Sequence, residues 1–203
     1  GSSRLFYLAR RIQDYTQWSQ ELRLGGEIAS GIDYVVGGYW FKSSYDLDQD
    51  TLFFAPTGRQ LVTGKTESYA FFGDFNWTIV PTVRLSFGGR WSHDNKKLTN
   101  DQITTAGVLI PVGAGNASFS KFTPKVGLDW RPNNDTMLYT SWSRGYRSGG
   151  FSPRAQTAAR ASTPFQPETV DAYEIGGKFS MLDNKLQLNL AAYYSDYKDM
   201  QQN

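Results

Sequence analysis

Apolar and polar residues alternate one by one along most of the chain, which is the pattern of a β-strand with two different faces. The clearest run covers residues 186–195. Its apolar face carries Leu186, Leu188, Leu190, Ala192 and Tyr194, and its polar face carries Gln187, Asn189, Ala191, Tyr193 and Ser195. Helical periodicity is nearly absent, and the best candidate is the alanine-rich stretch 155–161, which falls in an expected loop.

This alternation predicts about eight strands. The expected strands cover residues 17–27, 33–45, 65–77, 82–98, 119–130, 136–148, 169–180 and 185–199. They are longer than the usual strand of about 5–6 residues. About ten residues at about 3.3 Å each, tilted near 45°, span about 23 Å, which is close to the apolar band of an outer-membrane barrel.

The segments between the expected strands alternate strictly in length. The short ones are 28–31, 78–81, 131–135 and 181–184, and the long ones are 46–64, 99–118 and 149–168. Outer-membrane barrels have this arrangement, with short periplasmic turns and long, mobile extracellular loops. The expected fold class is therefore all-β, an antiparallel transmembrane β-barrel segment.

Composition agrees with a membrane barrel and narrows the function. The chain contains 13 Phe, 12 Tyr and 6 Trp. Trp77, Trp130 and Phe179 stand beside short turns, whereas Tyr194 and Tyr197 lie toward the opposite strand ends, as two aromatic belts would. The net charge of +2 gives no reason to expect a nucleic-acid partner, and the absence of cysteine excludes thiolate chemistry.

A soluble β-sandwich or small barrel would also show alternation. Charged residues in the middle of the polar faces favour the membrane barrel, because they suit a lumen that faces water or a plug. The expected lumen lining is Glu21, Arg23, Asp74, Arg84, Arg90, Lys125, Asp129, Glu174 and Lys178.

Candidate catalytic and metal-binding residues are few. His93 is the only histidine, so no site with several histidines can form, and we expect neither an enzyme nor a cofactor. Asp46, Asp48 and Asp50 resemble part of a calcium loop but lack its glycine and distal glutamate. We expect a solvated acidic loop there and no metal site.

A candidate ligand site lies at the end of one expected strand. It consists of Arg144, Tyr146, Arg147, Phe151 and Arg154. At the outer mouth of a barrel, these side chains could bind an anionic, aromatic ligand through bidentate arginine contacts and ring stacking. Two alternatives remain open, namely pairing with lipopolysaccharide phosphates and simple solvation of an arginine-rich rim.

Six segments in order resemble strands of the C-terminal barrel half of TonB-dependent receptors. They are Trp18–Leu24, Glu67–Gly73, Leu85–Trp91, Phe122–Leu128, Leu138–Arg147 and Pro167–Lys178. The resemblance covers nearly all of residues 1–203 and implies part of a 22-stranded barrel in the outer membrane of a Gram-negative bacterium.

The resemblance also implies uptake of a scarce nutrient, most often a ferric siderophore, driven by the TonB complex. The plug domain, through which TonB would act, and the TonB box are absent from the sequence. Outer-membrane lipid and lipopolysaccharide are the other expected partners. A complete eight-stranded barrel with a structural or adhesive role is the alternative, since eight strands can close around their own side chains.

Overall fold

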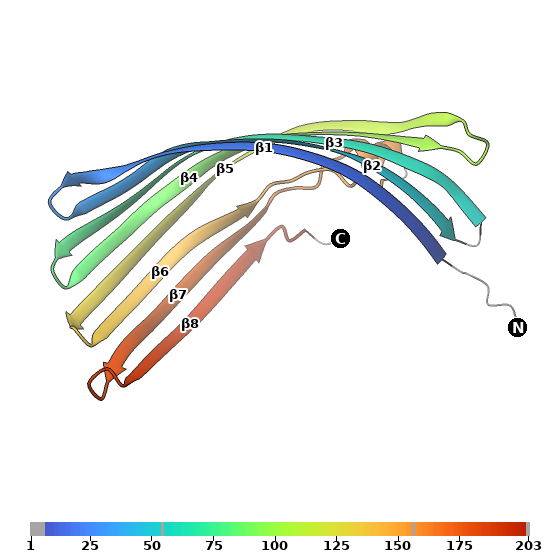
Figure 1. Ribbon diagram of the computed structural model, residues 1–203. Coiled ribbons are helices and arrows are strands. Elements are labelled where there is room, and N and C mark those ends of the chain that lie inside the picture. The colour runs from blue at the N-terminus through green and yellow to red at the C-terminus, as the bar shows by residue number, and fades with distance from the viewer. Residues whose placement is uncertain (1–6, 54, 156, 202–203) are drawn as a thin grey trace, which may run out of the picture.

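A computed structural model describes residues 7–53, 55–155 and 157–201. The chain forms one eight-stranded antiparallel sheet in which the strands follow one another in chain order (Figure 1). The strands are β1 (Tyr7–Ala29), β2 (Ile32–Phe53), β3 (Ala55–Val80), β4 (Val83–Ile103), β5 (Leu109–Asn133), β6 (Thr136–Arg147), β7 (Glu168–Met181) and β8 (Leu186–Lys198). The all-β antiparallel prediction is confirmed.

The sheet is curved but not closed. Each strand pairs with the next one, and β1 and β8 form the two edges of the sheet in the described part of the chain (Figure 1). The alternative of a complete eight-stranded barrel is therefore wrong, because closure would require β1 to pair with β8. None of the helices among the described residues is long and apolar enough to cross a membrane.

Two of the three expected long loops are strands instead. Segment 46–64 belongs mostly to the β2–β3 hairpin, and segment 99–118 belongs mostly to the β4–β5 hairpin. Backbone pairing continues to Phe53 opposite Ala55 and to Ile103 opposite Leu109. These extensions lie beyond the lipid-facing part of the sheet, so their convex face can be polar and the alternation that marks the other strands is weak.

The third long segment, 149–168, stays a connection, as predicted. It contains one short helix, α1 (Ala158–Ser162), which overlaps the alanine-rich stretch 155–161 that was the best helical candidate in the sequence. Thr157 is the N-cap, and its side-chain oxygen accepts a hydrogen bond from the Arg160 amide. The predicted short turns are also confirmed, since β1–β2, β3–β4, β5–β6 and β7–β8 are joined by a few residues each.

Pairing register and alternation divide the side chains of the sheet into two faces. Leu190 lies opposite Gly177, which lies opposite Leu138, whereas Asn189 lies opposite Lys178. The same count through all strands puts every residue of the expected lumen lining on one face, the concave one (Figure 1). The predicted orientation of β8, leucines on one face and amides on the other, agrees with this register.

Charges on the concave face are paired across strands. The ammonium group of Lys125 on β5 lies 2.8 Å from the Asp74 carboxylate on β3, so the ion pair passes over β4. Gly88 is the β4 residue between them, and a Cβ at this position would overlap with the Asp74 side chain. Glycine at position 88 therefore makes room for the ion pair.

Aromatic residues on the convex face form two belts. Near the short turns, Phe75 and Phe87 stack with ring centroids 5.3 Å apart. Further out, Phe71 stacks on Trp91 at 6.3 Å. Further members of the outer belt are Trp18, Trp40, Tyr69, His93, Phe122, Trp142, Tyr173 and Tyr194. Tyr197 does not belong to this belt, because its odd position on β8 places it on the concave face.

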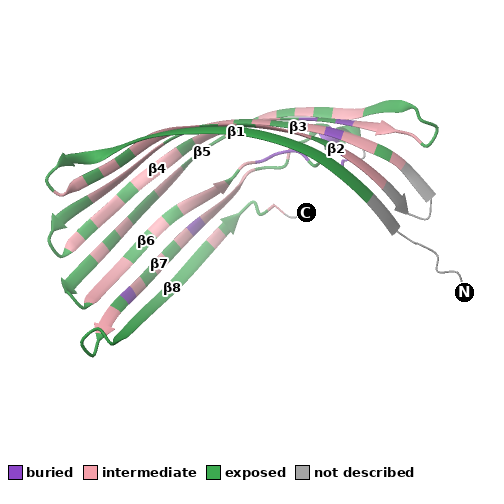
Figure 2. Cartoon of the chain, viewed as in Figure 1, coloured by how far each residue is buried: buried purple, intermediate pink, exposed green. Residues whose placement is uncertain are grey.

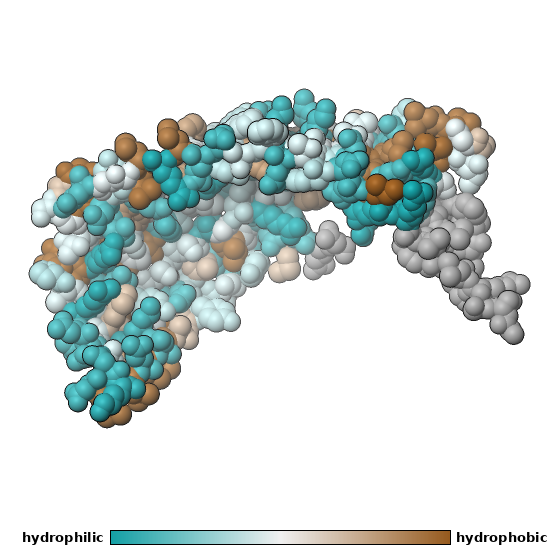
Figure 3. All heavy atoms as spheres, in the orientation of Figure 1, coloured by the Kyte–Doolittle hydropathy of each residue, from teal (hydrophilic) through white to brown (hydrophobic). Residues whose placement is uncertain are grey.

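The sheet has little conventional core, because one of its faces meets lipid and the other meets the lumen. Exposed and half-buried residues alternate along most strands, and buried residues are rare (Figure 2). Hydrophobic residues reach the surface near the short turns and gather again at the tip of the β4–β5 hairpin (Figure 3). That tip carries the exposed side chains of Val108, Leu109 and Ile110.

Depth in the membrane follows from the same register. Leu188 lies opposite Phe179 at the inner belt, and Tyr194 lies opposite Tyr173 at the outer belt, so Leu190 is the leucine closest to the midplane. In a receptor with a closed barrel that contains this segment, Leu190→Arg should destabilise the fold by about 2–4 kcal/mol. Leu188→Arg, near the interface, should cost only about 0–1 kcal/mol.

Ala191→Arg, on the lumen side of the same strand, is the matched control and should cost little. The measurement is the unfolding free energy of each variant in phospholipid bilayers, from denaturant titration. Equal losses for Leu190→Arg and Ala191→Arg would mean that the two faces are assigned wrongly.

Candidate functional site

The β6–β7 connection, residues 148–167, folds into the concave side of the sheet (Figure 1). Its anchor is Phe151, which is only 8% exposed and packs against Leu47, Val62 and Leu98 of β2, β3 and β4. The ring sits over Gly115 of β5, where any Cβ would overlap with it. This is the hydrophobic core of the described chain, and it joins the connection to both long hairpins.

A polar clamp holds the same connection. The carbonyl oxygen of Ala155 accepts a hydrogen bond of 2.6 Å from Asn100 Nδ2 and one of 3.1 Å from Gln60 Nε2. Asn100 is completely buried, and its Oδ1 accepts a second bond from Gln60 at 3.1 Å. Because a buried polar group without a partner is costly, this network fixes where the chain crosses the hairpins.

An ion pair closes the base of the connection. Arg144 at the end of β6 donates two hydrogen bonds, of 2.9 and 2.8 Å, to the Asp171 carboxylate near the start of β7. Asp171 is only 5% exposed. The guanidinium of Arg144 holds the pKa of Asp171 below its ordinary value, because it stabilises the ionised carboxylate.

Below the connection, the concave face contains a pocket of about 300 Å³. It is lined by Tyr39, Phe41, Ser68, Tyr69, Ala70, Arg90, Ser92, Asp94, Tyr146 and Ser148. The Arg90 guanidinium lies 5.2 Å from the centre of the Tyr39 ring, and Tyr146 Oη donates a long hydrogen bond of 3.4 Å to Asp94. The pocket thus combines aromatic rings with one cation and one carboxylate.

Further cations lie beside this pocket at the outer mouth. Lys96 is half-buried on the concave face of β4, and its burial lowers its pKa; the Asp94 carboxylate acts in the opposite direction, and the nearby charge of Arg147 lowers the pKa further. Arg147 and Arg154 are exposed. The mouth therefore carries net positive charge where a ligand would enter.

The five residues of the predicted ligand site have different environments. Tyr146 lines the pocket, and Arg147 and Arg154 are free at the surface, whereas Arg144 is held by Asp171 and Phe151 is buried in the core. Sequence reasoning did not assign Tyr39, Phe41 or Asp94 to a site. Tyr39 and Phe41 belong to a strand whose apolar face could not be chosen from the sequence, so only the register places them in the lumen.

Asp46, Asp48 and Asp50 were expected to lie in a solvated loop, but they lie on strand β2. They alternate along a strand on its convex face. Asp48 is bound by the guanidinium of Arg59, and Asp46 accepts a hydrogen bond of 2.6 Å from Thr63 Oγ1. The carboxylates of Asp46 and Asp48 are therefore engaged with protein partners.

His93 lies in the outer aromatic belt. Its ring is stacked between Tyr69 and Trp91, at 5.3 and 6.0 Å, and its Nδ1 lies 2.7 Å from Ser120 Oγ. These contacts place the histidine on the convex face, away from the pocket in the lumen.

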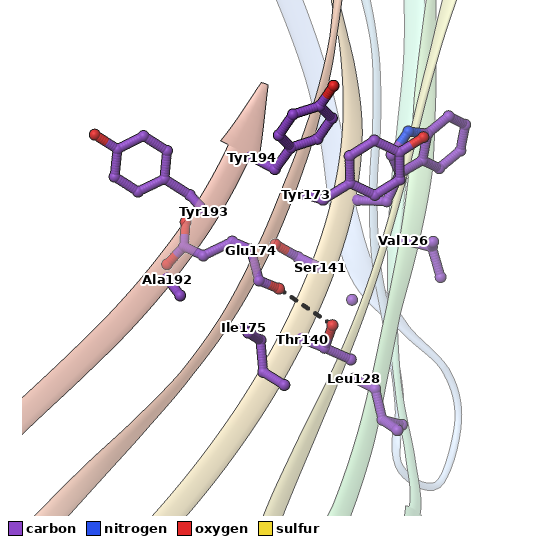
Figure 4. A pocket seen from close by; sticks show the side chains of 12 residues that line it. Val126, Leu128, Thr140, Ser141, Tyr173, Glu174, Ile175, Ala192, Tyr193 and Tyr194 are labelled. Atoms are coloured by element: carbon purple, nitrogen blue, oxygen red, sulfur yellow. Dashed lines mark hydrogen bonds between the residues drawn. The ribbon is translucent and has the colours of Figure 1, made fainter. Parts of the chain in front are cut away.

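A second hollow, of about 530 Å³, lies on the convex face of β5–β8 (Figure 4). Tyr173 and Tyr194 stand side by side at one end, with centroids 6.4 Å apart, and Ile175 and Leu128 lie toward the other end. This hollow faces the hydrocarbon, so an acyl chain can fill it, and it offers no convergent polar groups to a soluble ligand.

The polar clamp can be tested by proteolysis. Asn100→Leu leaves the Ala155 carbonyl with only the Gln60 bond, and losing a buried hydrogen bond costs about 1–3 kcal/mol. The connection should then open more often, and trypsin should cut after Arg154 or Arg160 about tenfold faster. Thr99→Leu, on the other face of the same strand, should leave the cleavage rate unchanged. Equal rates for Asn100→Leu and the parent would show that the clamp is not needed.

The Arg144–Asp171 pair predicts a specific pH dependence. Since the folded-state pKa of Asp171 is lowered, the pair stabilises the base of the connection above the unfolded pKa of about 3.9. This stability is lost as the pH falls through the lower, folded pKa. Amide protection at residues 144–148 and 168–171, taken relative to the intrinsic exchange rate at each pH, should therefore stay high between pH 5 and 7 and fall only below about pH 4.

Asp171→Asn should exchange faster than the parent at pH 6 and should lose the acid-induced step. An acid-induced step that persists in this variant would assign the transition to another carboxylate.

Comparison with known proteins places the chain in a family. Residues 1–203 match the family described as TonB dependent receptor-like, beta-barrel. Among curated proteins, the TonB-dependent siderophore receptor PiuA of Acinetobacter baumannii is 25% identical over 125 residues, which is 60% of this chain and 16% of that protein.

Solved structures share the fold. The ferric yersiniabactin uptake receptor FyuA of Yersinia pestis superposes with a TM-score of 0.85 at 23% identity, over 98% of this chain and 31% of that one. The alcaligin receptor FauA of Bordetella pertussis gives 0.61 at 17% identity, over 95% and 30%. The chain thus spans about a third of the length of these structures.

The predicted family is confirmed by these matches together with the open, two-faced sheet. The chain belongs to the TonB-dependent receptor β-barrel family, whose members are outer-membrane proteins of Gram-negative bacteria.

Proposed function

We propose that this chain forms part of the wall and the outer mouth of a receptor that imports a ferric siderophore. Family membership supports uptake across the outer membrane. One similar protein, PiuA, is a siderophore receptor by name, and FyuA is named as a ferric yersiniabactin uptake receptor. Energy from the TonB complex would act through a plug inside the barrel, as is general in the family.

The observation that carries the proposal is the pocket on the concave face. Arg90 lies over the Tyr39 ring within this pocket, and Tyr146 and Phe41 add aromatic surface. An anionic ligand with aromatic groups could therefore stack on the rings and accept hydrogen bonds from the guanidinium. Such a ligand would meet Arg147 and Lys96 on its way in.

The predicted site residues take two roles in this proposal. Tyr146, Arg147 and Arg154 would contact the ligand or attract it. Arg144 and Phe151 would act indirectly, since the first fixes the base of the connection and the second anchors it on the hairpins. The connection would then be a fixed part of the ligand site, held against the wall before the ligand arrives.

Substitution of Arg90 tests this proposal. In the full-length receptor, Arg90→Gln should weaken binding of the cognate ferric siderophore by about ten- to a hundredfold, because a hydrogen bond to a charged group contributes about 1.5–3 kcal/mol. Arg147→Gln should mainly slow association, since an exposed rim charge steers the ligand. The measurement is a fluorescence titration with a panel of ferric siderophores at two salt concentrations.

Arg84→Gln is the matched control, because Arg84 lies on the same concave face but near the short turns. It should leave ligand affinity unchanged. A receptor that binds none of the siderophores, or an Arg90→Gln variant with parental affinity, would contradict the proposed function.

A further inference from the structure

Three lysines stand together on the convex face, just outside the outer aromatic belt. Lys42, Lys65 and Lys97, from β2, β3 and β4, line a hollow of about 590 Å³, which Trp18 and Trp40 also line. We propose that this hollow binds the phosphate groups of lipopolysaccharide, the phosphorylated glycolipid of the outer leaflet, and that the lipid lies against the β1–β4 wall.

Pairing register brings the positive charges close together. Lys65 and Lys97 are direct cross-strand partners, and like charges in this relation destabilise a sheet. All three lysines are exposed, and none has an ion-pair partner among the residues that the structure describes. A bound phosphate between the two ammonium groups would turn this repulsion into attraction.

One carboxylate, that of Glu67, borders the hollow, and it accepts a hydrogen bond from a tryptophan there. Glu67 lies opposite Lys42 in the register, and its Oε1 accepts a hydrogen bond of 3.2 Å from Trp40 Nε1. The hollow as a whole therefore keeps a surplus of positive charge. The bond also fixes the Trp40 ring, which presents a rigid surface at the boundary between acyl chains and head groups.

The depth of the lysines matches a phosphate layer. Lys42 is two residues beyond Trp40, Lys65 is four beyond Tyr69, and Lys97 is four beyond His93. At about 3.3 Å per residue and a tilt near 45°, the backbone of each lysine lies about 5–9 Å beyond the belt residue on its own strand. Long lysine side chains at this level reach the interface readily.

The surface below the lysines suits acyl chains. Leu22 is 80% exposed and Phe71 is 65% exposed on the convex face of β1 and β3, and Trp18, which lies opposite Lys42, is 68% exposed. One molecule with acyl chains and phosphates could therefore cover both parts. A soluble anion would satisfy the lysines but leave these side chains uncovered.

The same level of the convex face on β5–β8 lacks this arrangement. Its positions on β5 are Asn116, Ser118 and Ser120, which carry no charge. On β8, Lys198 has the Asp196 carboxylate 3.9 Å away. The positive surface is therefore local to β2–β4 and is not a general property of the rim.

The test uses the full-length receptor purified from outer membranes in mild detergent. Native mass spectrometry and phosphate analysis measure the lipopolysaccharide that remains bound to the parent and to the K65T/K97T variant. We expect at least a tenfold loss in this variant. K65R/K97R keeps both charges and should retain the lipid, and Lys178→Thr, on the concave face, should behave like the parent.

Stability gives an independent readout. In bilayers without lipopolysaccharide, K97T should be more stable than the parent, because it removes a like-charge pair. In bilayers with lipopolysaccharide this order should reverse. Bilayers with dephosphorylated lipopolysaccharide should behave like bilayers without it, and inorganic phosphate alone should not restore the parent's advantage.

Three results would overturn the proposal. They are equal lipid retention by the parent and K65T/K97T, loss of lipid from K65R/K97R, and full restoration of the parent's advantage by inorganic phosphate. Siderophore affinity is measured on the same samples and should not change, since these lysines lie on the opposite face from the pocket. The two proposals are therefore tested separately: a receptor that binds no siderophore could still retain lipopolysaccharide, and a receptor that loses lipopolysaccharide could still bind a siderophore.

Discussion

Backbone hydrogen bonding in hydrocarbon is the constraint on which this structure depends. A peptide N–H or C=O without a partner costs several kcal/mol in a bilayer, so every strand that crosses must be paired on both sides. Six of the eight strands meet this requirement within the sheet, while β1 and β8 each expose one edge. In a membrane, both edges must be paired by further strands, which agrees with the match to about a third of much larger barrels.

Pairing on both sides leaves the side chains to deal with two different environments. The convex face uses leucines and aromatic belts against lipid. The concave face carries charges and resolves them locally, for example by the Lys125–Asp74 ion pair over Gly88. A buried core forms only where the β6–β7 connection covers the concave face, around Phe151 and Asn100. The most fully buried side chains therefore lie at the outer mouth, beside the proposed ligand pocket.

Much of this could be predicted from the sequence, because alternation in the membrane part has strong contrast. Leu190 and Asn189 on β8, and Arg90 on β4, lie on the faces that the pattern assigns. Beyond the bilayer the convex face meets water instead of lipid, so the contrast weakens, and segments 46–64 and 99–118 looked like loops although their backbones pair. The burial of Phe151 depends on Gly115 and Leu98, which are distant in sequence and meet only through the register. No local pattern could show this.

Because the side-chain period of a strand is two, neighbouring residues serve opposite functions along a single strand. On β4, Arg90 faces the pocket while Trp91 faces the outer belt. Six residues further on, Lys96 faces the lumen while Lys97 faces the proposed lipid site. A shift of the register by one residue would exchange each pair, putting an arginine into lipid and a tryptophan into the lumen. The long hairpins outside the membrane oppose such a shift. In them, β4 pairs with both of its neighbours without a break from Trp91 to Asn100. Their extra pairing therefore protects both surfaces at once, which gives a physical reason for strands that continue so far beyond the bilayer.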